Sequence, residues 1–159
     1  MTCAPWLPEL VILDNYGGNW NNYLEALYRC FCKDFVYSKP LFKGKPIALK
    51  RYPLCQGKEA TFWHIISEGS KNTKGDIDLR RCERILWPKP IIEHSEESIV
   101  KDWKNRRKGE TRICLWLETH EYLVVLAERK DYILFWTAYL VTEKHQKRRL
   151  QMEYEQYCR

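Results

Sequence analysis

Apolar residues recur every three or four positions between Asn19 and Val36, which is the spacing of one face of an α-helix. These positions are Trp20, Tyr23, Leu24, Leu27, Tyr28, Phe31 and Phe35. Asn19 or Asn21 is available to cap the first turn, because an asparagine side chain can accept a hydrogen bond from a free backbone N–H group. The pattern predicts an amphipathic helix that follows an N-terminal extension over residues 1–18.

The next part of the chain consists of short apolar pieces separated by turn-forming residues. Its residue pattern predicts strands at Ile47–Tyr52 and Thr61–Ser67, with a turn at Pro53–Lys58 between them. The Gly69–Gly75 segment has the composition of a loop.

Two short helices are predicted after that loop. Asp76 or Asp78 can cap a helix that runs to about Trp87, where the Pro88-Lys89-Pro90 segment is expected to end it. Ser95–Lys104 places three apolar residues on one side of a second short helix.

The last third of the chain has the clearest strand pattern. Three runs of apolar, β-branched and aromatic residues are joined by short connections: Thr111–Glu118, Glu121–Glu128 and Tyr132–Val141. Glu143–Tyr157 then predicts a basic terminal helix. We therefore expect a single α+β domain over residues 1–159, with an N-terminal helix, an antiparallel sheet of four or five strands that ends in a meander, and flanking helices.

Composition excludes several classes of protein. The 159 residues are 45% hydrophobic and 14% aromatic, which is too apolar for a disordered chain. Charged residues interrupt every long apolar run and the first residues lack the pattern of a secretory signal, so we expect a cytoplasmic protein without a membrane span. The seven cysteines are expected to be reduced, and their spacing does not indicate a metal site. The net charge of +6 suggests an anionic partner such as nucleic acid.

His64 is the histidine best placed for chemistry. The common nucleotide-binding, zinc-protease and serine-hydrolase motifs are missing from the sequence, and we expect no cofactor. His64 lies in an otherwise hydrophobic run, where strand alternation would place it on the same side as Phe62 and Ile66. Imidazole is the side chain best suited to general acid–base catalysis near neutral pH. The alternative is a core histidine that bonds to the backbone or to a neighbour.

Basic residues flank this position on both sides in the sequence. Lys50 and Arg51 end the preceding predicted strand, and three arginines project from the helix that follows, at Arg80, Arg81 and Arg84. Guanidinium groups match the geometry of phosphate oxygens, so these arginines could clamp a phosphodiester. The alternative is a solvated helix face paired with nearby carboxylates.

Thr137 and Tyr139 add two hydroxyl groups to the last predicted strand. They are two residues apart, so both side chains leave the same face of the strand. The alternative is that threonine and tyrosine are present only because both are good strand formers.

Together these features resemble the barnase–EndoU–colicin–RelE superfamily of small RNases, in particular its phage-associated toxin-like branch. The similar features are an early histidine, basic residues and the Thr137-Ala138-Tyr139 segment on the last strand, and they span a nuclease-like core of about 45–141. The terminal basic helix at 143–157 follows this core. The chain differs from EndoU in lacking a second matching histidine, and from RelE-type members in having fewer basic residues on its last strands.

The resemblance implies a metal-independent endoribonuclease in which the 2′-OH of RNA attacks the adjacent phosphate. The residues implied to be catalytic are His64, Arg81, Thr137 and Tyr139. Those implied to bind substrate are Lys50, Arg51, Arg80, Arg84 and Lys144. The implied partners are RNA, either tRNA or mRNA, and a neutralising antitoxin or immunity protein.

Two other functions fit the same sequence. The basic and aromatic residues could form a nucleic-acid-binding module without catalytic activity. Alternatively, the protein could be a phage protein-interaction or inhibitor domain, in which the aromatic residues form the core and the charges only keep it in solution.

Overall fold

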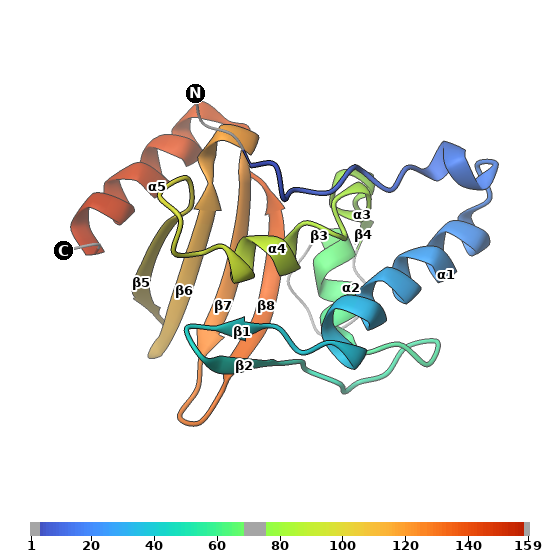
Figure 1. Ribbon diagram of the computed structural model, residues 1–159, viewed down its shortest axis with the longest axis horizontal. Helices are drawn as coiled ribbons and strands as arrows, with labels where there is room; N and C mark the ends of the chain where they lie inside the picture. Colours follow the sequence, from blue (N-terminus) through green and yellow to red (C-terminus); the bar gives the residue numbers. More distant parts are fainter. Residues whose placement is uncertain (1–3, 69–75, 158–159) are drawn as a thin grey trace.

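Within residues 4–68 and 76–157, which the computed structural model describes, a six-stranded sheet forms the centre of the molecule (Figure 1). The strands are β1 (Leu41–Phe42), β2 (Lys45–Ala48), β5 (Lys101–Arg107), β6 (Glu110–Leu117), β7 (Tyr122–Glu128) and β8 (Ile133–Leu140). Their order across the sheet is β1-β2-β8-β7-β6-β5. Strands β5 to β8 form an antiparallel meander, and β2 pairs with β8 in parallel over two residues. A separate small sheet pairs β3 (Ser67–Glu68) with β4 (Asp76–Ile77).

The predicted α+β class is confirmed, and so are the three strands of the last third. The main sheet differs from the prediction in having six strands among the described residues and one parallel pair. β1 is only two residues long, so it is too short to produce a recognisable pattern. The parallel contact joins strands far apart in the sequence, and no local pattern encodes it.

Helices cover both faces of the sheet. They are α1 (Trp20–Phe31), α2 (Ala60–Ile66), α3 (Leu79–Glu83), α4 (Pro88–Glu93) and α5 (Lys144–Tyr157). Asn19 caps α1 as predicted, since its Oδ1 accepts a hydrogen bond of 3.0 Å from the Asn22 backbone N–H. Wider π-helical turns over Cys32–Tyr37 continue α1, and α5 confirms the predicted terminal helix. Among the described residues, none of the helices has both the length and the apolar character needed to cross a membrane.

The two faces of the sheet carry separate hydrophobic clusters. Aromatic rings from α1, its continuation and α2 pack against one face, where the Phe35 and Phe135 ring centroids are 4.8 Å apart. On the other face, Trp103 and Trp116 pack with Leu150 of α5. Figure 1 shows α5 beside β5, while α2 and α3 lie beyond β8.

The predicted strand at Thr61–Ser67 is wrong, because residues 60–66 form α2. Phe62, Trp63, Ile65 and Ile66 are all buried, so this segment is apolar on every side and has no helical period to recognise. Its position is fixed by contacts that are distant in the sequence. The Thr61 hydroxyl accepts a hydrogen bond of 2.7 Å from the Lys50 N–H and donates one of 3.2 Å to the Lys50 carbonyl.

Three further boundaries differ from the predictions. The predicted helix at Ser95–Lys104 is wrong, since β5 begins at Lys101 and alternates buried Trp103 and Asn105 with exposed residues. Pro88 begins α4 instead of ending the preceding helix, because proline fits the first turn, where its missing N–H costs no helical bond. β2 ends at Ala48, before the predicted limit. The predicted loop at Gly69–Gly75 lies outside the described residues.

A β-bulge in β8 changes which side chains face α5. Val125 of β7 pairs with Thr137 while the next residue, Leu126, pairs with Phe135, so Trp136 is an extra residue on β8. A bulge places two consecutive side chains opposite one partner and re-aims the strand locally. Phe135 and Ala138 pack into the core on the opposite face of the sheet, whereas Trp136, Thr137 and Tyr139 line the same hollow on the α5 face.

Candidate active site

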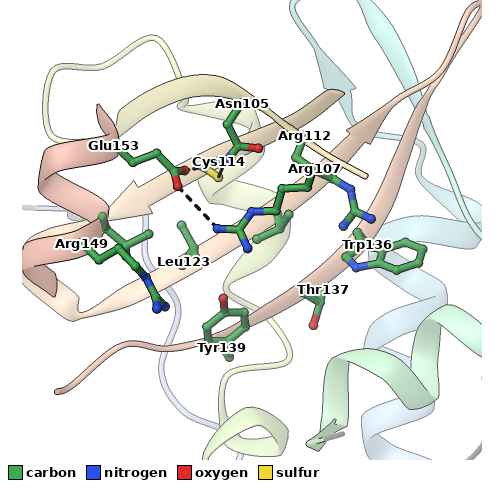
Figure 2. A pocket seen from close by; sticks show the side chains of 12 residues that line it. Asn105, Arg107, Arg112, Cys114, Leu123, Trp136, Thr137, Tyr139, Arg149 and Glu153 are labelled. Atoms are coloured by element: carbon green, nitrogen blue, oxygen red, sulfur yellow. Dashed lines mark hydrogen bonds and ion pairs between the residues drawn. The ribbon is translucent and has the colours of Figure 1, made fainter. Parts of the chain in front are cut away.

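A cavity of about 220 Å³ lies between α5 and the face of the sheet that α5 covers (Figure 2). Its floor is formed by β6, β7 and β8, and its sides by β5 and α5. The lining residues include three arginines, one carboxylate and the three residues around the bulge: Arg107, Arg112, Arg149, Glu153, Trp136, Thr137 and Tyr139. The hydroxyl-bearing pair predicted from the sequence therefore faces a cavity rather than the core.

Arg81 connects this cavity to α2 and α3. Asp78 caps α3 by accepting hydrogen bonds from the backbone N–H groups of residues 80 and 81, and its carboxylate lies 3.6 Å from Arg81 Nε. Arg81 Nη1 donates to the Ser67 carbonyl at 2.6 Å and makes a longer contact of 3.5 Å with Thr137 Oγ1. Its guanidinium carbon lies 5.1 Å from the centre of the Tyr139 ring. Arg81 thus holds both hydroxyl-bearing residues in place.

His64 lies at the same edge of β8. Its backbone carbonyl accepts a contact of 3.4 Å from Arg81 Nη1, and its ring centroid is 5.7 Å from that of Trp136. Nε2 is inaccessible to solvent and makes no hydrogen bond with any described residue. Burial lowers the pKa of His64, and the positive charges of Lys50 and Arg81 lower it further. The imidazole is therefore neutral at neutral pH, which is the form that a general base requires.

Tyr139 keeps its proton near neutral pH. Burial raises the pKa of its hydroxyl, and this effect outweighs the nearby arginine charges that lower it. Because Arg81 occupies a face of the ring, the hydroxyl is the part of Tyr139 best placed to interact with a ligand. Thr137 complements it, since an oxygen that accepts from Arg81 can direct its own proton elsewhere.

The structure brings together only part of the predicted set. Arg81 contacts Thr137, the Tyr139 ring and the backbone carbonyl of His64. The His64 ring itself lies beside Trp136, and Lys50 is close enough to influence it electrostatically.

The other predicted substrate-binding residues lie elsewhere. Arg51 is exposed and lines a different hollow, beside Lys39. Arg80 is 61% exposed and pairs with Glu83. Arg84 lies over the Trp87 ring, with its guanidinium carbon 5.1 Å from the ring centre. Lys144 is exposed on the first turn of α5.

The sequence interpretation missed the arginines on the α5 face. Arg112 alternates with Cys114 and Trp116 along β6, and this spacing of two could have indicated that it shares their face. Its guanidinium carbon lies 4.4 Å from the Trp136 ring centre, while a nitrogen pairs with Glu110 at 2.7 Å. The role of Trp136 could not be recognised, because the bulge that exposes it depends on pairing with β7.

The cavity has an excess of positive charge. Its three arginines face a single lining carboxylate, Glu153. That carboxylate accepts hydrogen bonds from Trp103 Nε1 at 2.7 Å and from Asn105, and it pairs with Arg107 at 3.4 Å. Arg149 makes no ion pair with any residue that the structure describes. Such a cavity favours an anionic ligand with several acceptor oxygens, and a phosphate group fits this description.

The described residues contain no group of three or more His, Cys, Asp or Glu side chains arranged to hold a metal ion. Known proteins provide no further guide to this site, since no protein-family model, curated protein sequence or solved structure matches the chain.

Proposed function

We propose that this protein is a toxin-like endoribonuclease that cleaves RNA by transesterification without a metal ion. The contacts of Arg81 with Thr137, with the Tyr139 ring and with the His64 backbone carbonyl carry the proposal, together with the position of the His64 ring beside Trp136. These residues come from α2, α3 and β8, and an arginine-lined cavity adjoins them. A neutral imidazole, two hydroxyl donors and nearby guanidinium groups are the components that this reaction needs.

In the proposed reaction, RNA supplies its own nucleophile. Neutral His64 removes the proton from a ribose 2′-OH through its Nδ1 atom, because its Nε2 atom is inaccessible to solvent. The resulting oxyanion attacks the adjacent phosphorus. The bond from phosphorus to the 5′-oxygen breaks, and this oxygen takes a proton from water and leaves as a 5′-hydroxyl. Protonated His64 returns its proton to the hydroxide that remains, which restores the neutral imidazole. The other product ends in a 2′,3′-cyclic phosphate. No bond is oxidised or reduced, so the reaction needs no further reactant.

The remaining residues stabilise charge or fix geometry. The Thr137 and Tyr139 hydroxyls would donate hydrogen bonds to the phosphoryl oxygens as negative charge develops on them. Arg112, stacked on Trp136, contributes a positive charge to the same cavity. Arg81 is a positioning residue in this scheme, because its Nη1 atom is engaged by the Ser67 carbonyl and by the contact with Thr137.

The proposal includes a biological setting. A ribonuclease that acts on tRNA or mRNA in the cytoplasm of its own cell must be held inactive until it is needed. We therefore include a neutralising antitoxin or immunity protein as a partner.

The experiment is cleavage of total RNA by the purified protein in excess EDTA, with the new ends analysed for 2′,3′-cyclic phosphate. His64→Gln should lower the rate by about 100-fold or more, the range for loss of a general base. His94→Ala is the matched control, since His94 stacks on Trp6 with ring centroids 4.4 Å apart and does not line the cavity. Circular dichroism should show that both variants are folded.

Two results would count against the proposal. RNA binding without any cleavage product, unaffected by His64→Gln, would favour the nucleic-acid-binding module instead. Absence of both binding and cleavage at physiological salt would favour the protein-interaction domain.

A further inference from the structure

We infer that the part of the cavity next to α5 is a second phosphate subsite, which binds a phosphate neighbouring the one that is cleaved. The inference rests on the proposed function for its substrate class, single-stranded RNA. Arg107 of β5 and Arg149 of α5 form this subsite. Figure 2 shows both side chains extending into one hollow, with Tyr139 drawn between Arg149 and Thr137.

Two arginines with different surroundings supply the subsite. Arg107 is 59% exposed, and its Nη2 lies 3.4 Å from Glu153 Oε2, which holds the guanidinium group over the sheet. Glu153 is itself fixed by hydrogen bonds from Trp103 and Asn105. Arg149 lies one helical turn before Glu153 and has no carboxylate partner among the described residues. The Arg107 guanidinium group is therefore oriented in advance by Glu153, and that of Arg149 is available to bind a ligand.

The chemistry of the cavity suits a phosphate group. Two guanidinium groups that project from separate elements can together offer several N–H donors to one tetrahedral anion. The cavity also retains an apolar floor from Leu123 and Val125. An RNA strand carries one phosphate per nucleotide, so a strand with one phosphate at Thr137 necessarily places another close by. A subsite at the α5 end of the same cavity would hold that neighbour and align the strand.

The subsite can be tested without relying on cleavage. A dinucleotide with 2′-O-methyl groups lacks the nucleophile and carries a single phosphate. Adding a terminal phosphate, at either the 5′ or the 3′ end, provides the neighbouring one. The ratio of the two affinities, measured by isothermal titration calorimetry, gives the contribution of the second phosphate. We expect a ratio of about tenfold for one end in the unmodified protein, a typical effect of a charge-assisted contact.

Arg149→Gln and Arg107→Gln should each lower this ratio toward one. Arg106→Gln is the matched control and should keep it, because Arg106 bonds to Thr111 and the Gly109 carbonyl and does not line the cavity. The inference is overturned if neither terminal phosphate improves binding, or if the ratio is unchanged in both cavity variants. If the ratio behaves as expected but RNA is never cleaved, the subsite stands and the proposed endoribonuclease activity fails.

Discussion

Replacing Arg81 with methionine should destabilise the protein by about 3 kcal/mol. Methionine keeps the apolar stem but removes every donor. A hydrogen bond between a charged group and a buried carbonyl contributes about 1.5–3 kcal/mol, and the Ser67 carbonyl would lose such a bond of 2.6 Å. The contact with the Tyr139 ring adds about 0.5–2 kcal/mol. The side chain is only 14% exposed, so water cannot readily replace these partners.

The measurement is urea unfolding followed by tryptophan fluorescence, since the chain contains seven tryptophans. For a chain of 159 residues, 3 kcal/mol corresponds to a fall of about 10 °C in the melting temperature. RNA cleavage should fall as well, because Thr137 and Tyr139 would lose the group that positions them.

Arg80→Met is the matched control. Arg80 precedes Arg81 directly, but it is 61% exposed and its only ion pair among the described residues is with Glu83 at 3.1 Å. A surface pair of this kind contributes about 0–1 kcal/mol. If the two variants have unfolding free energies within about 0.5 kcal/mol of each other, the contacts of Arg81 do not hold α3 to β8.

Two further predictions concern Thr137 and His64. Thr137→Val should lower the cleavage rate by about 100-fold, because the variant loses a hydrogen-bond donor to the transition state. Thr137→Ser keeps the hydroxyl and should retain most of the rate. A Val variant with the full rate would contradict the role of the hydroxyl. Because burial and nearby cations lower the pKa of His64, the unfolded chain binds its proton more tightly than the folded protein does. This histidine should therefore make the free energy of unfolding rise with pH up to about 6.5 and level off above it, and the same pH dependence in His64→Gln by urea titration would contradict this.

The parts of the fold that local patterns encode were predictable. α1 and α5 show helical spacing, and β6, β7 and β8 are strand-like runs joined by short connections. α2 was predicted as a strand because its burial on all sides removes the period that distinguishes the two structures. The sequence predicts that Pro88 ends a helix, whereas it begins α4. A proline can occupy either position, and packing decides which of the two it takes.

The candidate site was predictable as a set of residue types, but not as an arrangement. Thr137 and Tyr139 share a face as their spacing indicates, although His64 reaches them from a helix rather than from a strand. Arg81 and Arg84 were equivalent in the sequence. In the structure, Arg81 contacts Thr137 and Arg84 lies over Trp87. α3 ends at Glu83, so Arg84 follows the helix and does not continue its spacing.

The extra residue in β8 makes the site depend on the number of residues in this strand as well as on their types. Side chains in a regular strand alternate, so Thr137 would share a side with Phe135 if the strand had no bulge. The bulge at Trp136 shifts this parity, which sends Phe135 into the core and Thr137 into the cavity. Deleting one residue at the bulge would move the side chains on one side of the deletion to the opposite face of the sheet. Core residues would then face the cavity and cavity residues the core, even if both hydroxyl-bearing residues were kept. In any alignment of this strand with another protein, the placement of a single gap therefore decides whether the two hydroxyls correspond.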